Sequence, residues 1–274
     1  MKTTVITMLA MSFVLTSCVK VKNENGEKGK DGWEFFSGNK GNGAITEKTY
    51  DGDIDQIKVS TSIDAEVIKS DAEKVVISAP SDIMDNIKVA LKGGVLAVYV
   101  DSGFGNNIST KNVRVKIYVK DFNQLSADSS ADIKVLDTFT QDKVDVYISS
   151  SASIDVANLE ANDLKIYTNS SGDFSGKIWA VNLGAYASSS GDINIFGKAK
   201  NATMDSNSSG DLKATDLIVE NAILSASSSG DIVTSVSKSL TANANSSGEI
   251  TVYKKGNLEQ TQIHKNSGGD VYLK

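Results

Sequence analysis

The chain has 274 residues, of which 40% are hydrophobic and 23% are charged, and its formal net charge is −6 at pH 7. This mildly acidic balance, with Arg114 as the single arginine, excludes the basic surface that nucleic-acid-binding proteins use. Cys18 is the single cysteine, so no disulfide forms within the chain, and packing and hydrogen bonds must stabilise the fold.

The first eighteen residues predict a lipoprotein signal. Lys2 precedes the apolar run "VITMLAMSFVL", which is too short for a permanent membrane-spanning helix. The run ends in "LTSC", which resembles the lipobox of bacterial lipoproteins, where the cysteine is acylated after cleavage. We therefore expect a signal peptide at residues 1–17 and a lipid on Cys18, with a free or core thiol as the alternative. Cleavage would remove Lys2 and leave 27 basic and 34 acidic residues, a net charge of −7.

Residues 18–40 predict a flexible tether between the lipid and the folded region. The stretch "VKVKNENGEKGKDG" is polar, charged and rich in glycine, with too few apolar side chains to form a core. A contact of Lys20 and Lys22 with lipid headgroups is the alternative to a fully solvated tether.

Residues 41–122 predict β-strands that are longer and less regular than those that follow. Pro80 is expected in a loop beside a short helical turn at residues 81–86. In "VRVKIYV" the residues Val113, Val115, Ile117 and Val119 alternate with polar neighbours. We interpret this region as a wider N-terminal section and cap of one β-helix that covers residues 41–274. A separate small β-domain is the alternative.

Residues 123–274 are built from eight repeats. A pentapeptide such as "SSGDI" recurs at intervals of 18 to 21 residues, with a serine two places before a small residue and an apolar residue two places after it. An acidic residue follows the small one in seven of the eight units. A repeat of about twenty residues indicates a solenoid. The small residues are Ala131, Ala152, Gly172, Gly191, Gly210, Gly230, Gly248 and Gly269.

Between the pentapeptides the apolar residues alternate with polar ones, as Val144, Val146 and Ile148 do. This period of two is typical of a half-buried strand. Each unit predicts a strand of about six residues, a corner and a shorter strand, and stacked units bury what one unit cannot. The fold class is therefore all-β, a right-handed single-stranded parallel β-helix with coils of about twenty residues. The hand follows the general preference of parallel crossovers.

The pentapeptide is interpreted as the corner of each coil. Glycine is expected to supply a positive φ there, and the acidic residue to cap the amides of the turn. The serine two places earlier is expected to point inward and to hydrogen-bond to the serines of the neighbouring coils.

The sequence predicts no catalytic, cofactor-binding or metal-binding residue. His264 is the single histidine and has no nucleophile beside it in the repeat, so we expect a solvated residue near the C-terminal edge and not a catalytic base. Trp33 and Trp179 are the two tryptophans, and with aromatic residues at 7% no stacking groove for sugar rings is expected. The glycine-rich "GKGKDG" precedes no helix and predicts no phosphate loop.

One column of acidic residues leaves a ligand open as an alternative. If the coils are in register, Asp173, Asp192, Asp211 and Asp231 stand about 5 Å apart on one edge. Such a row could bind calcium. The sequence lacks the "GGxGxD" spacing that surrounds an ion from two sides, so we expect these carboxylates to face water without a metal.

The stretches "GNGAITEKTYDGDIDQIKVSTSIDAEVI", "IKVALKGGVLAVYV" and "VRVKIYVKDFNQLSADSSADIKV", followed by the "SSGD" corners, resemble the head GIN domain family of autotransporter adhesins. The resemblance covers residues 41–274. It implies a right-handed β-helix in an envelope lipoprotein at the outer membrane, of the kind common in the Bacteroidota and related to toastrack modules. Ala131, Ala152 and Ser153 depart from the glycine-acid corner, and looser turns are expected there.

The predicted function is that of a non-catalytic cell-envelope lipoprotein, a binding or adhesive module held at the membrane by its N-terminal lipid. Its partner would be a glycan or an envelope protein, and not a nucleic acid. The alternative is a periplasmic accessory or sensory module of envelope-stress maintenance that acts through protein contacts. The charges after Cys18 are basic before they are acidic, so the periplasmic and the surface-exposed side of the outer membrane both stay open.

Overall fold

The structure is a computed structural model that describes residues 41–103 and 108–274. The predicted signal peptide, Cys18 and the tether at residues 18–40 lie outside the described residues. All seventeen described strands belong to one sheet. Among the described residues no helix is long or apolar enough to span a membrane.

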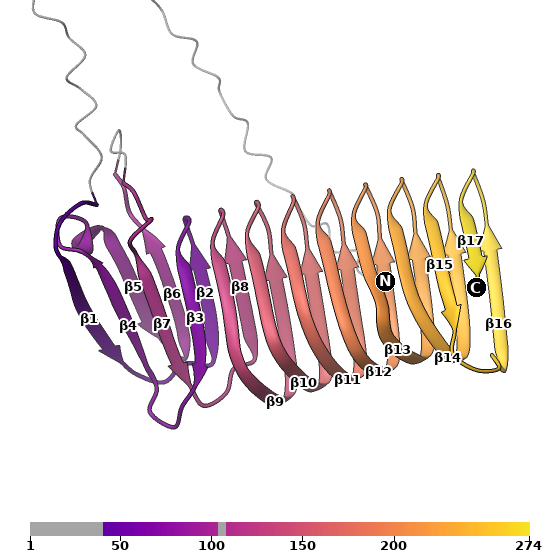
Figure 1. The fold of residues 1–274 in the computed structure, drawn as a ribbon, viewed down its shortest axis with the longest axis horizontal. Coiled ribbons are helices and arrows are strands. Elements are labelled where there is room, and N and C mark those ends of the chain that lie inside the picture. The colour runs from indigo at the N-terminus through magenta and orange to yellow at the C-terminus, as the bar shows by residue number, and fades with distance from the viewer. Residues whose placement is uncertain (1–40, 104–107) are drawn as a thin grey trace, which may run out of the picture. The chain divides into compact units, whose positions relative to one another are not determined.

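Six long strands form the regular coils, and each pairs in parallel with the next. Figure 1 shows them as a row of arches, with narrow turns along one edge and bends along the other. This arrangement confirms the predicted all-β parallel β-helix with coils of about twenty residues, and its right hand stays a prediction. The strands are β9 (Asp132–Ile148), β10 (Ser153–Thr168), β11 (Asp173–Ala187), β12 (Asp192–Ser206), β13 (Asp211–Ala226) and β14 (Asp231–Ala244).

Each of these six coils differs from the prediction in having one strand from turn to turn and not two. The chain bends within the strand, where the pairing register shifts, as between Val156 and Asn158 of β10. In β12 the bend contains Gly197 with φ +120°, and a Cβ there would lie 2.1 Å from the Ile178 carbonyl oxygen of the previous coil. Because glycine has no Cβ, the two strands stay paired through this bend, with Ile178 opposite Gly197.

The core is the interior of the stacked coils. The apolar residues predicted to point inward are buried, including Ile133, Ile154, Phe174 and Ile193 in one column, each at most 1% exposed. The column before each turn contains Ile148, Thr168, Ala187 and Ser206 in register. Burial of this apolar area is the main favourable term for folding.

The corner of each coil is a type I′ turn, and the predicted role of its glycine is wrong. The positive φ angles belong to the two serines, as at Ser208 (52°) and Ser209 (62°). Gly210 donates its N–H to the Asn207 carbonyl at 3.0 Å and closes the turn. Glycine is needed at position 210 for a steric reason. A Cβ there would lie 2.7 Å from the Ala187 carbonyl carbon of the previous coil.

The predicted inward column of serines is also wrong. The serines lie at the exposed tips of the turns, and the contacts from coil to coil use their backbone groups. Ser190 donates its N–H to the Ser208 carbonyl at 3.2 Å, and Ser209 donates to Ser228 at 3.1 Å. The small residues therefore allow one turn to pass close to the next.

The two turns with alanine are slightly wider than those with glycine, as expected for looser turns. Ala131 and Ala152 donate their N–H groups at 3.3 and 3.2 Å, against 2.8–3.0 Å in the six glycine turns. The serines of these turns keep the same positive φ, so the extra methyl group widens the turn without changing its type.

The N-terminal section contains one more coil of the same kind, which the sequence analysis did not detect. Its turn is the "STSID" stretch, where Thr61 and Ser62 have φ of 62° and 53° and Ser62 donates its N–H to the Ser129 carbonyl at 2.9 Å. The strands of this coil, β2 (Gln56–Ser60) and β3 (Asp64–Lys69), pair in parallel with β8 (Gln124–Asp128) and β9.

Antiparallel pairs are confined to the N-terminal section, among the described residues. β1 pairs with β4, β4 pairs with β7, and β5 pairs with β6. Pro80 was predicted in a loop but is the last residue of β4, ahead of a 3₁₀ turn. The elements are β1 (Ile45–Asp51), β4 (Lys74–Pro80), η1 (Met84–Asn86), β5 (Ile87–Lys92), β6 (Val95–Val100) and β7 (Arg114–Val119).

The C-terminal coils are interrupted at the bend. β14 pairs with both β15 (Glu249–Lys254) and β16 (Gln260–Lys265), and β15 pairs with β17 (Asp270–Leu273).

Candidate functional site

The predicted lipid site lies outside the described residues. Cys18 and Trp33 both fall there, so the acylation of Cys18 stays a prediction.

The acidic column is in register, as the sequence predicted. Asp173, Asp192, Asp211 and Asp231 are partners on successive strands, and each is the first residue of its strand. The column continues to Glu249 at one end. Lys213 pairs with Asp211 at 3.3 Å and provides part of the counter-charge.

Partial desolvation and neighbouring carboxylates act on two members of this column. Partial desolvation, followed by the neighbouring carboxylates Asp192 and Asp155, raises the pKa of Asp173 above its usual value. Desolvation and the carboxylates of Asp211 and Glu249 raise the pKa of Asp231 in the same way. A search of the described residues finds no group of three or more His, Cys, Asp or Glu side chains placed to hold one ion.

We expect calcium to leave the stability of the protein nearly unchanged. An ion bound at a hundredfold excess over its Kd would add about 2.7 kcal/mol, which is equivalent to a rise of about 5–10 °C in the melting temperature. The measurement compares thermal melts in millimolar calcium and in chelator. A rise of that size, absent from a variant with Asp192→Asn and Asp211→Asn, would instead make the column a calcium site.

His264 and Trp179 lie on different strands of the sheet. His264 is exposed in β16, in register with Asn243. Trp179 is 46% exposed in β11, and its partners on the neighbouring strands are Glu160 and Lys198.

The structure contains an aromatic stack that was not predicted from the sequence. Tyr147, Tyr167 and Tyr186 are in register on β9, β10 and β11, and they point outward from the strand segments that lead into the turns. Their ring centroids are 5.1 and 4.8 Å apart, and the rings are within 5° and 9° of parallel. The parallel register thus converts three separate tyrosines into one continuous stack.

A shallow groove of about 580 Å³ follows this stack. We name it the tyrosine groove. It is lined by the three tyrosines, by Ser126 of β8, and by a polar row at the turns, together with the backbone between them. The polar row consists of Asp128, Ser149, Asn169 and Ser188.

Asp128 is the charged member of the groove. Its carboxylate accepts hydrogen bonds from Ser149 Oγ at 2.9 Å and from Ser129 Oγ at 3.1 Å. Partial desolvation acts to raise the pKa of Asp128, but hydrogen bonds from the side chains of Ser149, Ser150 and Ser129 outweigh it and hold the pKa below its usual value. The groove therefore contains an ionised carboxylate at neutral pH.

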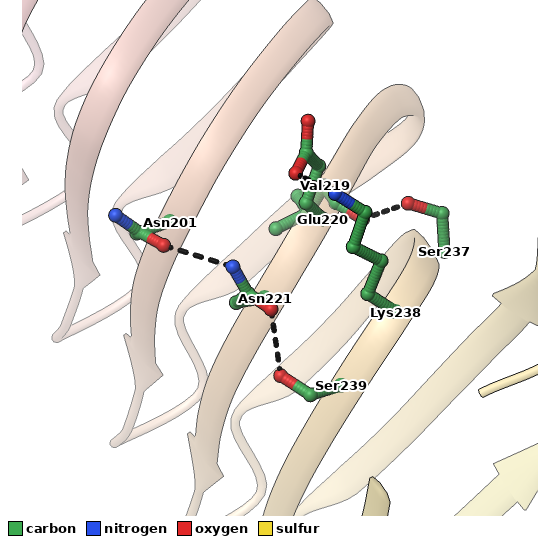
Figure 2. Close-up of polar contacts among 7 residues, drawn as sticks. All are labelled: Asn201, Val219, Glu220, Asn221, Ser237, Lys238 and Ser239. Carbon is green, nitrogen blue, oxygen red and sulfur yellow. Dashed lines mark hydrogen bonds and ion pairs between the residues drawn. The ribbon is translucent and has the colours of Figure 1, made fainter. Parts of the chain in front are cut away.

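Farther from the turns, an asparagine ladder runs across β11, β12 and β13. Asn201 Nδ2 donates to Asn182 Oδ1 and Asn221 Nδ2 donates to Asn201 Oδ1, both at 3.0 Å. Ser239 Oγ donates to Asn221 Oδ1 at 2.9 Å and ends the run shown in Figure 2. Because these amides bond to one another, the ladder fixes the register of the coils and leaves fewer polar groups for a ligand.

The signal for the tyrosine stack was present in the sequence. Three successive units have tyrosine at the same repeat position, in "VYISS", "IYTNS" and "AYASS". The overall aromatic content could not reveal it, because the stack depends on position within the repeat and not on abundance.

Comparison with protein-family models gives one match, described as "Putative auto-transporter adhesin, head GIN domain", over residues 53–174 and 153–256. No protein of curated function matches the chain.

Solved structures from Parabacteroides species share the fold. A "Putative lipid binding protein" from Parabacteroides distasonis is 24% identical with a TM-score of 0.76, and a putative adhesin from the same species is 22% identical with a TM-score of 0.77. A putative adhesin from Parabacteroides merdae is 18% identical with a TM-score of 0.74. Each match covers 85% of this chain and 98% of the other.

Proposed function

The chain belongs to the head GIN domain family of autotransporter adhesins, and from this membership we propose that it is a non-catalytic binding or adhesive module of the cell envelope. The lipid on Cys18 would hold it at the outer membrane. Its partner would be a glycan or an envelope protein.

The tyrosine groove is the observation that supports a binding role most directly. Tyr147 is 42% exposed, although an aromatic ring is costly to leave in water. Aromatic rings beside a few convergent polar groups are typical of ligand-binding surfaces. The hydroxyl, amide and carboxylate groups of the polar row supply those polar groups along the same groove.

A second role, as a periplasmic accessory module acting through protein contacts, is favoured by a different surface. Trp179, Phe196 and Ile218 are 46%, 44% and 40% exposed at the bends of neighbouring coils. Large exposed apolar side chains that gather on one edge are common at protein interfaces.

Protease treatment of intact cells separates the two roles and tests the anchor in the same experiment. We expect the wild-type protein to be cleaved on intact cells and to be labelled by a fatty-acid analogue, because a surface-displayed module must be accessible and lipidated. Cys18→Ser should lose the label. Full protection from protease until the outer membrane is opened would favour the periplasmic role, and equal labelling of both proteins would exclude Cys18 as the lipid site.

A further inference from the structure

We propose that the tyrosine groove binds a β-1,4-linked pyranose chain, with one sugar ring against the open face of Tyr147. This proposal rests on the proposed binding function and specifies its ligand class.

One face of Tyr147, at the end of the tyrosine stack, is uncovered. Tyr167 covers one face of Tyr147 at a centroid distance of 5.1 Å. On the other side the register places Ser126 opposite Tyr147, and serine is too small to cover a phenol ring. The resulting space is one coil wide, about 4.8 Å, and its wall is an electron-rich ring face. Such faces attract the partly positive C–H groups that one side of a pyranose ring presents.

Polar groups beside this face match the hydroxyls of a sugar. The carboxylate of Asp128 lines the groove and accepts hydrogen bonds from Ser129 Oγ and Ser149 Oγ. Hydrogen bonds to an ionised acceptor are stronger than neutral ones. Ser126 Oγ accepts a bond from Gln124 Nε2 at 3.1 Å and keeps its own proton to donate.

Beyond Tyr147 the groove presents ring edges and polar groups. Tyr167 and Tyr186 are stacked with their centroids 4.8 Å apart, so their facing sides are covered, and Asn169 and Ser188 lie beside them in the groove. The C–H groups of a β-1,4-linked pyranose lie on the faces of its ring, so one ring can stack on Tyr147 while its neighbours meet polar groups.

The test is isothermal titration of the purified full chain with four β-1,4-linked tetrasaccharides, of glucose, N-acetylglucosamine, mannose and xylose. We expect at least one to bind, and Tyr147→Ala to weaken that binding about tenfold. Tyr147→Phe should retain binding because the ring face remains. Tyr99→Ala is the matched control, since Tyr99 is 40% exposed on β6 and lies outside the groove.

Ser126→Tyr tests the open ring face while Tyr147 itself is kept. The new ring should extend the stack, fill the space and abolish binding, while the circular dichroism spectrum stays that of the wild type. Failure of all four tetrasaccharides to bind at millimolar concentration, or unchanged binding by Ser126→Tyr and Tyr147→Ala, would overturn the proposal. These measurements use no cells, so their failure would leave the protease and labelling results of the proposed function unaffected.

Discussion

Replacing Phe174 by alanine should lower the free energy of unfolding by about 3–5 kcal/mol. Phe174 is 1% exposed and lies between Ile154 and Ile193 in one inward column. Its removal would leave a cavity that the coils on either side cannot close, because their own backbone ladders fix the spacing between them. Equilibrium denaturation in urea measures the change.

Phe196→Ala is the matched control for this prediction, since it deletes the same side chain from the next coil. Phe196 is 44% exposed at the bend, and its loss should cost less than about 0.5 kcal/mol, as for most surface substitutions. Equal losses for the two variants would mean that the Phe174 column is not the core of the helix.

Gly210→Val should destabilise the protein by about 3 kcal/mol, at the upper end of what overpacking costs. A Cβ at this position would lie 2.7 and 2.8 Å from the carbonyl carbon and oxygen of Ala187. These atoms belong to the backbone of the previous coil, so no side-chain rotation can relieve the contact. Asp211→Asn, one residue later at the partly exposed start of β13, should change stability by less than about 0.5 kcal/mol.

Ser209→Gly distinguishes this steric cause from a conformational one. Ser209 has φ of 62°, a region that costs a non-glycine residue about 1 kcal/mol or more. Glycine at position 209 should therefore be neutral or slightly stabilising, and thermal melts would show it. If Ser209→Gly and Gly210→Val were equally harmful, the turn geometry described above would be incorrect.

The fold was predictable because its two signals are periodic. The twenty-residue repeat and the alternation of residues such as Leu164 and Ile166 specify the coil and its inward face, and both residues are buried. The turn was not predictable in detail, because "SSG" is compatible with a positive φ at any of its three residues. The passage of one coil over the next decides among them, and the sequence of a single coil does not contain that contact.

The candidate site was less predictable than the fold. Tyr147 and Tyr186 are 39 residues apart (186 − 147), and only the register of three strands makes them parts of one surface. The acidic column was predicted because its members belong to the pentapeptide itself. Residues outside that motif, such as Asp128 and Ser126, gain their role from neighbours that the sequence alone does not place.

The parallel register also has a consequence for the order of folding. Neighbouring coils in the regular part pair residues about twenty positions apart, as Asp192 and Asp211 are, whereas the first coil pairs Asp64 with Asp132, 68 positions apart (132 − 64). Closing the longer loop costs about 1 kcal/mol more in chain entropy, so nucleation is expected among the regular coils. The first coil would then join a structure already formed by the residues that follow it. A segment that leaves the ribosome before the regular coils would thus reach its native contacts after them.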